Sequence, residues 1–321
     1  MQNVAASYGA RAGSKNVCEL PRQLPCLIRP AVETDLHYPT EQISFLHDEI
    51  RHALLTGGAA VLRDFGIEDI LQFKQVVQDF SRANPWSYAG GASPRSALAD
   101  GVYTSTDYPP EMPLSLHNEL SYCAEYPRTL YFFCAIEPVD GGETTIGDSR
   151  RILAGIPREI SDLFKSKGIL YVRNLACDKR SPYSWQSAFE TDDPKIVESI
   201  CRRQRADFEW KQDGSLRVSF VGPATTVHPE TGEETWFNQA EGFHSGGMQN
   251  LAGPSSPRLE AYFGDGTRIP EECLREIRAV VARETILHPW RRGDIMIVDN
   301  ILTAHGRMPY SGPRKIAVAM V

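Results

Sequence analysis

The segment Leu114-Ser115-Leu116-His117-Asn118-Glu119-Leu120 alternates apolar and polar residues, as a short half-buried β-strand does. Residues two apart in an extended chain point to the same side, so His117 and Glu119 face one point while Asn118 faces away. An imidazole and a carboxylate at this spacing can bind the same metal ion. Because so short a pattern also arises by chance, the assignment needs support from elsewhere in the chain.

A candidate for the third ligand lies far downstream. The run Gly293-Asp294-Ile295-Met296-Ile297-Val298-Asp299-Asn300 has the composition of a strand, and it leads into a glycine-flanked turn that holds His305. Two imidazoles and one carboxylate can bind one face of a non-haem iron and leave the opposite positions open. We therefore expect His117, Glu119 and His305 to be iron ligands, with zinc hydrolysis as an alternative use of the same groups.

The residues that follow His305 favour a chelating keto acid. If 2-oxoglutarate occupies two open positions on Fe(II), its distal carboxylate needs a cation, preferably a guanidinium. The sequence 309–313 has turn composition, which would bring Arg314 back beside His305 on the next strand. We expect Arg314 to anchor this carboxylate, helped by the hydroxyl of Thr144 and by Arg307, for which a surface ion pair is the alternative.

The substrate pocket is less well defined by the sequence. Loop-rich insertions near 84–113 and 175–192 are candidates for its walls, because aromatic residues and turns gather in both. We predict that Asn118, Trp236 and Asn238 contact the substrate, although a core strand would also explain the last two.

The composition excludes several classes of protein. With a formal net charge of −7 over 321 residues, the chain lacks the clustered basic residues that a nucleic-acid partner requires. No apolar run approaches the ~20 residues that span a bilayer, so we expect a cytoplasmic protein without a membrane partner. The 7 cysteines include no C-x-x-C pair, which favours reduced thiols. Homo-oligomer formation is left open.

The pattern along the chain indicates a mainly β, α+β fold. Residues 1–20 have no periodicity and are expected to form a flexible tail, whereas 21–321 are expected to form a single domain. Helical spacing of apolar residues occurs at 41–55, 70–80, 156–167, 193–204 and 270–284, and strand composition at 59–63, 129–137, 143–146, 216–221, 235–238, 294–298 and 315–321. Short strands with helices packed outside predict a jelly roll, also called a double-stranded β-helix.

Taken together, these motifs resemble the taurine dioxygenase-like family of Fe(II)/2-oxoglutarate oxygenases, and within it the branch of the syringomycin-pathway aspartyl hydroxylase. The resemblance covers most of the chain. It is carried by the segments 116–122, 141–144, 236–239, 293–300, 305–307 and 312–314. It implies a jelly-roll fold, the three iron ligands named above, and Arg314 and Thr144 as contacts of the distal carboxylate. It also implies that molecular oxygen and a small-molecule substrate are used.

Two positions depart from the family pattern. Many members carry Asp where this chain has Glu119, which is longer by one methylene but still offers an anionic oxygen. The second arginine of the family, four residues after the anchoring one, is Val318 here. Because related halogenases replace the carboxylate ligand with Ala or Gly, Glu119 favours hydroxylation or another oxygen-derived oxidation.

The resemblance implies an amino acid or a related acyl group as the substrate, either free or tethered to a carrier protein in secondary metabolism. A sulfonate or aryloxy-acid oxygenase of the same family remains an alternative, and so does a non-catalytic jelly-roll binding protein.

Overall fold

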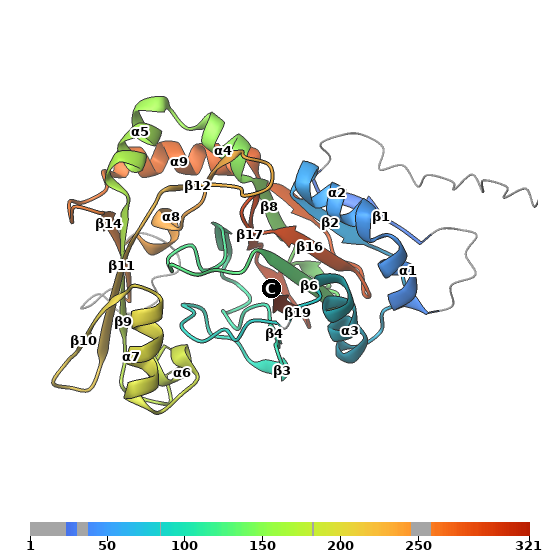
Figure 1. The fold of residues 1–321 in the computed structure, drawn as a ribbon, viewed down its shortest axis with the longest axis horizontal. Helices are drawn as coiled ribbons and strands as arrows, with labels where there is room; N and C mark the ends of the chain where they lie inside the picture. Colours follow the sequence, from blue (N-terminus) through green and yellow to red (C-terminus); the bar gives the residue numbers. More distant parts are fainter. Residues whose placement is uncertain (1–23, 31–37, 84, 182, 245–257) are drawn as a thin grey trace, which may run out of the picture.

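The computed structural model describes residues 24–30, 38–83, 85–181, 183–244 and 258–321, so the tail expected at 1–20 lies outside the described residues. Two mainly antiparallel sheets form the centre of the molecule (Figure 1). The larger has the order β1 (Cys26–Ile28), β2 (Ala59–Leu62), β16 (Ile295–Asp299), β6 (Thr129–Ile136), β19 (Lys315–Met320), β4 (Val102–Thr104) and β3 (Ala97–Ala99). The smaller has the order β15 (Ile286–His288), β8 (Thr144–Asp148), β17 (Thr303–Arg307) and β5 (Leu114–His117).

The larger sheet is buried on both faces because its strands alternate between two apolar clusters. On β6, Leu130 and Phe132 join the cluster that faces the smaller sheet. Their neighbours Tyr131 and Phe133 join the cluster on the other face. This period of two is the expected geometry of a strand. It explains why the sequence of β6 reads as an unbroken apolar run.

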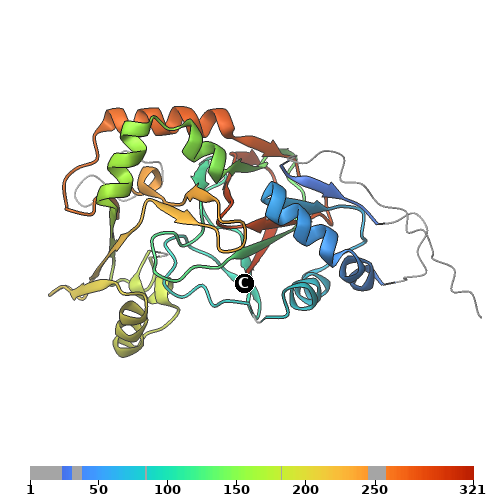
Figure 2. The same cartoon turned by 45° about the horizontal axis from the view of Figure 1, so that its top comes forward.

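Three helices cover the outer face of the larger sheet, as Figures 1 and 2 show. They are α1 (Pro39–Phe45), α2 (His47–Gly57) and α3 (Ile70–Ser81). The side chain of Asp69 caps α3 by accepting hydrogen bonds from two backbone amides of its first turn. The single helix expected at 41–55 is divided at Leu46, and the expected stop at the glycine pair is confirmed, since Gly58 has a φ of +88°.

A third sheet, of four strands, lies beside the central pair (Figure 1). Its order is β10 (Asp207–Trp210), β11 (Leu216–Gly222), β9 (Ile169–Leu175) and β14 (Leu259–Phe263). The sequence predicted β11 but not the other three strands. Two short pairs complete the strands, β12 (Thr225–Val227) with β13 (Glu234–Trp236), and β7 (Asp140–Gly141) with β18 (Tyr310–Ser311).

The remaining helices pack outside the sheets, as expected. The helices predicted at 156–167, 193–204 and 270–284 are confirmed, with bounds shifted by one or two residues. They correspond to α5 (Arg158–Lys167), α7 (Pro194–Arg203) and α9 (Glu271–Glu284); α4 (Ser149–Gly155), α6 (Trp185–Phe189) and α8 (Ala240–Phe243) complete the set. This mixture of helices and antiparallel sheets confirms the predicted fold class.

The expected turn around His305 is wrong. His305 lies in the middle of β17, which pairs with β8 on one side and with β5 on the other. Gly306 permits this close packing, because a Cβ atom there would lie 2.4 Å from the carbonyl oxygen of Leu114. A strand inside a sheet fixes the direction of the imidazole more firmly than a loop would.

The state of the cysteines differs in part from the sequence prediction. Cys123, Cys134, Cys177, Cys201 and Cys273 are free thiols, as expected. Cys26 is disulfide-bonded, so the expectation of reduced cysteines is wrong there: a sequence without C-x-x-C can still bring two cysteines within bonding distance by folding.

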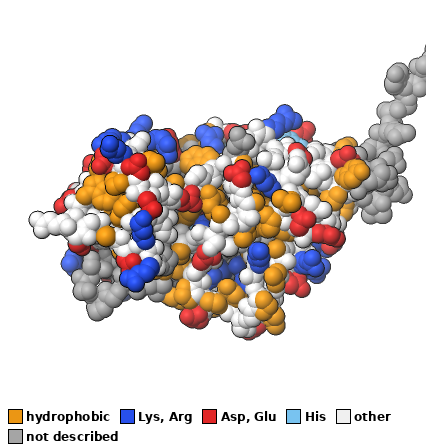
Figure 3. Space-filling view, turned by 90° about the horizontal axis from the view of Figure 1, so that it is seen from below, with side chains coloured by type: hydrophobic (Ala, Val, Ile, Leu, Met, Phe, Trp, Pro, Cys, Tyr) orange, Lys and Arg blue, Asp and Glu red, His pale blue; other side chains and the backbone are white. Residues whose placement is uncertain are grey.

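No helix in the described part of the chain is long and apolar enough to cross a membrane. On the face drawn in Figure 3, acidic and basic side chains are interspersed with apolar ones.

Candidate metal centre and carboxylate-binding cavity

The three predicted ligands come together between the two central sheets. His117 ends β5 and lies opposite His305 of β17 in the antiparallel register. Glu119 follows two residues later, and its Oε2 lies 3.9 Å from Nε2 of His117 and 3.7 Å from Nε2 of His305. One ligand atom from each side chain lies within 4.8 Å of the others. This set of donors fits a metal held on one face.

The imidazole of His117 is oriented for coordination. Its Nδ1 lies 2.9 Å from the carbonyl oxygen of Ser115, which can only accept a hydrogen bond, so Nδ1 carries the proton and Nε2 presents a lone pair. Burial and the nearby His305 lower the pKa of His117 to about 4. The ring is therefore neutral at physiological pH, as metal coordination requires.

Glu119 is held in its ionised form. Burial by itself raises the pKa of the carboxyl group, but the Arg95 guanidinium and the imidazoles of His305 and His117 outweigh burial and hold the pKa well below its usual range. Arg95 donates to Oε2 of Glu119 at 2.7 Å, and both side chains are only 4% exposed. The same carboxylate oxygen therefore faces both imidazoles and one guanidinium.

The backbone around Glu119 is fastened by Asn300. The side-chain oxygen of Asn300 accepts from the amide of Glu119 at 2.7 Å, and its nitrogen donates to the carbonyl oxygens of Glu119 and Pro127 at 3.0 and 2.8 Å. The side-chain nitrogen of Asn118 in turn donates a hydrogen bond to the backbone carbonyl of Asn300 at 2.7 Å. Asn118 thus points away from its neighbours in the triad, as predicted, and it joins the ligand loop to the end of β16.

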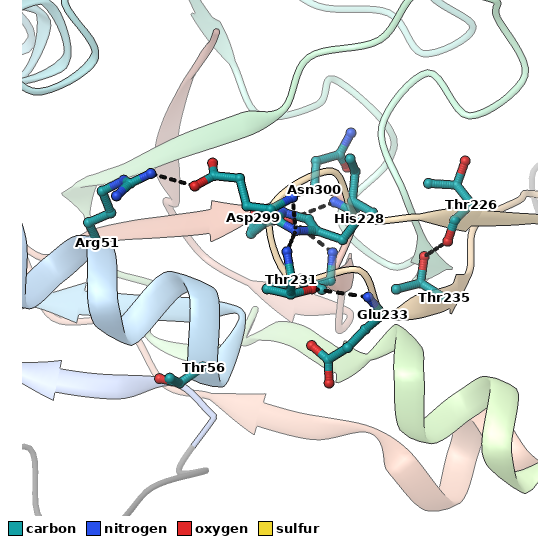
Figure 4. A network of polar contacts seen from close by, with 12 residues as sticks. Arg51, Thr56, Thr226, His228, Thr231, Glu233, Thr235, Asp299 and Asn300 are labelled. Atoms are coloured by element: carbon teal, nitrogen blue, oxygen red, sulfur yellow. Dashed lines mark hydrogen bonds and ion pairs between the residues drawn. The ribbon is translucent and has the colours of Figure 1, made fainter.

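A further histidine, which the sequence did not single out, supports this junction. Nε2 of His228 lies 3.0 Å from the carboxylate of Asp299, while its Nδ1 accepts from the amide of Thr231 at 3.0 Å (Figure 4). The Nε2 proton is therefore donated to Asp299. The other carboxylate oxygen of Asp299 accepts from the amides of Ile301 and Leu302 at 2.9 Å. These contacts shape the turn that leads from β16 into β17.

A cationic cavity adjoins the metal ligands. His117 and His305 line it together with Thr144 and with Arg95, Arg307 and Arg314, and no acidic side chain of the described residues is among its lining groups. A cavity with three guanidinium groups and no carboxylate is complementary to an anion.

Arg314 and Thr144 have donors available for such an anion. Arg314 donates from Nε to the carbonyl oxygen of Gly142 at 3.0 Å, and it forms no ion pair with the described residues. Burial and the neighbouring Arg307 lower the pKa of Arg314 to about 10, so it stays charged at neutral pH. The hydroxyl of Thr144 accepts from Nε1 of Trp290 at 2.9 Å, which leaves its own proton to be donated.

Arg307 lines the same cavity, but most of its hydrogen bonds go elsewhere. Its guanidinium donates to the carbonyl oxygens of Tyr108, Pro109 and Met112, the last two at 2.7 and 2.6 Å. These contacts fasten the loop that leads into β5. The expected role of Arg307 toward the co-substrate stays a prediction, and its role in holding this loop is an addition from the structure.

A second, larger cavity of about 260 Å³ touches the other side of the site. Its walls include His117 and the three predicted substrate residues, Asn118, Trp236 and Asn238. The amide of Asn238 donates to the carbonyl of Ala224 at 2.8 Å and accepts from Ala240 at 3.1 Å. Both polar atoms of the Asn238 side chain and the side-chain nitrogen of Asn118 are thus engaged in contacts with the backbone. Substrate contact by these three residues stays a prediction.

Sequence reasoning missed Arg95, Asn300 and His228. Arg95 lies in a loop, where an arginine usually reads as a solvated charge. Asn300 and Asp299 offered a weak signal, because two side chains that favour local hydrogen bonds follow directly after an apolar strand. Contacts between residues about 180 positions apart, such as Asn300 with Glu119, have no signature in the local sequence.

The metal centre and the family match given next define a non-haem oxygenase that depends on Fe(II) and 2-oxoglutarate. The family model described as "Taurine catabolism dioxygenase TauD, TfdA family" matches residues 22–320, and the chain belongs to this family. This confirms the family to which the motifs pointed, and the narrower branch stays a prediction.

Two relatives extend over most of the chain. The dapdiamide synthesis protein DdaC of Enterobacter agglomerans is 36% identical over 286 residues, which cover 86% of this chain and 86% of that protein. A clavaminate synthase-like protein of Arabidopsis thaliana is 29% identical over 302 residues, which cover 92% and 87%.

Solved structures agree at the level of the fold. PvcB of Pseudomonas aeruginosa, described as an Fe, alpha-ketoglutarate dependent oxygenase from an isonitrile synthetic pathway, has a TM-score of 0.53 at 16% identity, covering 92% of this chain and 85% of that one. AAD-2 in complex with Mn(II) and N-oxalylglycine has a TM-score of 0.50 at 14% identity, covering 86% of each chain.

Proposed function

We propose that this oxygenase hydroxylates an unactivated C–H bond of an amino acid or a related acyl group, presented on a carrier protein in natural-product biosynthesis. The similarity to a dapdiamide synthesis protein supports the biosynthetic setting. Retention of Glu119 as the third protein ligand supports hydroxylation, because this coordination position is not left open to a halide. In this proposal residues 21–321 form one catalytic domain. The described residues of the loops near 84–113 and 175–192, which the sequence offered as walls of the substrate pocket, do not line the larger cavity.

The observation that carries the co-substrate half of the proposal is the cationic cavity next to the triad. We assign Arg314 and Thr144 of this cavity to the distal carboxylate of 2-oxoglutarate. Arg314 uses only Nε in its hydrogen bond to Gly142, and the hydroxyl of Thr144 accepts from Trp290, so both side chains still have donors for an anion. When bound, Fe(II) and 2-oxoglutarate together reduce molecular oxygen and supply the oxidant for the C–H bond. The protein contributes position and the exclusion of competing reactions.

We assign the larger cavity to the acyl chain of the substrate. It reaches His117, and its walls include apolar side chains of β5 and α9, such as Leu116, Ile277 and Val281. An apolar wall beside a metal ligand suits a hydrocarbon segment that has to be held near the oxidant without forming hydrogen bonds. The indole of Trp236, packed against Phe164 at 5.3 Å between ring centroids, would give this wall a fixed shape.

A co-product assay tests the proposal. The protein is supplied with Fe(II), 2-oxoglutarate and oxygen, and with a panel of amino acids that are offered both free and as thioesters on a carrier protein. We expect succinate formation and a gain of one oxygen atom with a carrier-bound aminoacyl group, and little turnover of the free form. His305→Ala is the inactive control, and His52→Ala, at an exposed position of α2, is the matched control that retains activity.

Three results would contradict the proposal. Equal turnover of free and tethered amino acids would remove the need for a carrier. Preferred turnover of a sulfonate or an aryloxy acid would move the substrate class to the alternative within the family. Hydrolysis that needs zinc and proceeds without oxygen would replace the reaction type altogether.

A further inference from the structure

The guanidinium of Arg95 is almost fully buried, yet only part of it is used. The side chain is 4% exposed, and Nη2 donates to Oε2 of Glu119 at 2.7 Å. Nε and Nη1 are buried and have no hydrogen-bond partner among the described residues. The central carbon of the guanidinium lies over the ring of Tyr88, 4.4 Å from its centroid. The group is therefore clamped in one orientation with donors left over.

Buried donors without acceptors are rare, because a buried guanidinium that has lost its water must be compensated by another partner. Glu119 supplies one anionic oxygen from outside the cavity that Arg95 shares with Arg314, and the wall of this cavity contains no carboxylate among the described residues. The unused donors thus face a position where an additional acceptor would be stabilised. The acceptor that suits a fork of neighbouring N–H groups is a carboxylate.

The position of Arg95 distinguishes it from Arg314. Arg95 contacts Oε2 of Glu119, the carboxylate oxygen that also faces His305, so its guanidinium lies beside the three side chains that would hold the metal. Arg314 donates to the backbone of Gly142, and no hydrogen bond or ion pair joins it to the triad within the described residues. Val318, four residues after Arg314, is an apolar core residue that is 1% exposed. It therefore supplies no second cation beside Arg314.

We propose that Arg95 binds the carboxylate of the 2-oxo acid that chelates the metal, while Arg314 binds the distal carboxylate. This inference rests on the cofactor assignment made above. It gives each end of the dianion its own guanidinium, and it makes Arg95 a co-substrate contact in addition to a partner of Glu119. The other source of a carboxylate at this place is the substrate, which the test below separates from the co-substrate.

The test compares two 2-oxo acids that differ at one end. 2-Oxoglutarate has both carboxylates, whereas 2-oxovalerate keeps the chelating end and lacks the distal one. Dissociation constants are measured without oxygen and without substrate, from the visible charge-transfer band of the Fe(II) complex. Arg95→Met is expected to weaken both acids by a similar factor, about tenfold or more. Arg314→Met is expected to weaken 2-oxoglutarate by about tenfold or more and to leave 2-oxovalerate within about twofold.

Arg95→Lys separates carboxylate binding from simple neutralisation of Glu119. The lysine keeps one positive charge in the cavity but replaces the fork by a single ammonium group. We expect it also to weaken both acids, and its folding is checked by circular dichroism together with that of Arg95→Met. If only one of the two variants folds, the inference requires that this variant bind both 2-oxoglutarate and 2-oxovalerate more weakly than the unmodified protein does.

Several outcomes would overturn the inference. Unchanged constants for both acids in the folded variants would do so. A lower affinity for Fe(II) together with unchanged binding of both 2-oxo acids would also overturn it, because Arg95 would then be a partner of Glu119 only. A raised KM for the substrate with unchanged 2-oxo acid binding would assign Arg95 to the substrate. Failure of the unmodified protein to form the band with 2-oxoglutarate would instead contradict the cofactor assignment.

Discussion

His117 and His305 lie directly opposite each other across the antiparallel pair β5 and β17, with their ring centroids 4.3 Å apart. Two strands separated by almost 190 residues of chain thus place their imidazoles on the same side of one sheet. Phe132 of the larger sheet packs against His305 at 5.2 Å between ring centroids and closes the site from the other side. Strands therefore hold two of the three ligands, more rigidly than loops would, and Glu119 lies in the turn that follows β5.

Removal of either imidazole should strongly weaken metal binding. His305→Ala is expected to lower Fe(II) affinity by about 100-fold or more, because one of three protein ligands is lost. Anaerobic titration with Fe(II) and 2-oxoglutarate measures this through the charge-transfer band. His52→Ala should titrate as the unmodified protein does. A band of full intensity in His305→Ala would mean that another residue supplies the third ligand.

The Asn300 side chain should stabilise both the fold and the metal centre. Asn300→Ala leaves the amide and carbonyl of Glu119 and the carbonyl of Pro127 without their partner in a fully buried place. We expect the free energy of unfolding to fall by about 3 to 5 kcal/mol. Fe(II) affinity should fall by about 10- to 100-fold, because the ligand carboxylate loses its fixed backbone.

Urea denaturation of the metal-free protein and Fe(II) titration check these two effects. Gln75→Ala, on the exposed face of α3, serves as the control and should change the free energy of unfolding by less than about 1 kcal/mol. A destabilised Asn300→Ala protein with unchanged metal affinity would show that the network supports the fold alone.

Arg307 should hold the loop that leads into β5. Arg307→Met removes three bonds to backbone carbonyls of the segment 108–112, so the free energy of unfolding should fall by about 3 kcal/mol. The released segment should also be cut faster in limited proteolysis. Arg292→Met changes an exposed arginine and is the control for both measurements. Weaker 2-oxoglutarate binding at unchanged proteolysis would favour the direct contact predicted from the sequence.

His288 should make the protein less stable in acid. Burial lowers the pKa of His288 to about 4, below the ordinary histidine value of about 6.5, so the folded state resists a proton that the unfolded chain accepts. The free energy of unfolding therefore decreases as the pH falls through the unfolded pKa, and the loss continues down to the folded one. Between pH 7 and pH 5 the His288 contribution to this loss should be about 2 kcal/mol.

His288→Phe should remove that contribution, because a phenyl ring does not titrate and the ring packs beside Trp290. Urea denaturation at pH 7 and pH 5, with a chelator present, compares the two proteins. The other histidines titrate equally in both, so the difference isolates His288. An identical pH dependence would show that His288 takes up its proton in the folded state as easily as in the unfolded one.

Local patterns in the sequence carry the predictions that proved correct. Apolar spacing located α3, α5, α7 and α9, and the unbroken apolar runs located β6, β16 and β19. These signals survive because burial of one helical face or of both strand faces leaves a fixed period in the chain. The strands β10 and β14 also alternate, but over only 4 and 5 residues, and the sequence did not reveal them.

By itself the sequence determined that His117 and Glu119 can reach one metal ion, because residues two apart in an extended segment point to the same side. In the structure β5 ends at His117, and the turn that follows brings Glu119 to the same place. Only the tertiary structure decided that His305 acts from within a strand, that Asn300 fixes the ligand loop, and that Arg95 is buried against Glu119. The physical reason is that burial and ion pairing depend on distances between segments far apart in the chain. A charge on a loop reads the same in the sequence whether it meets water or a carboxylate.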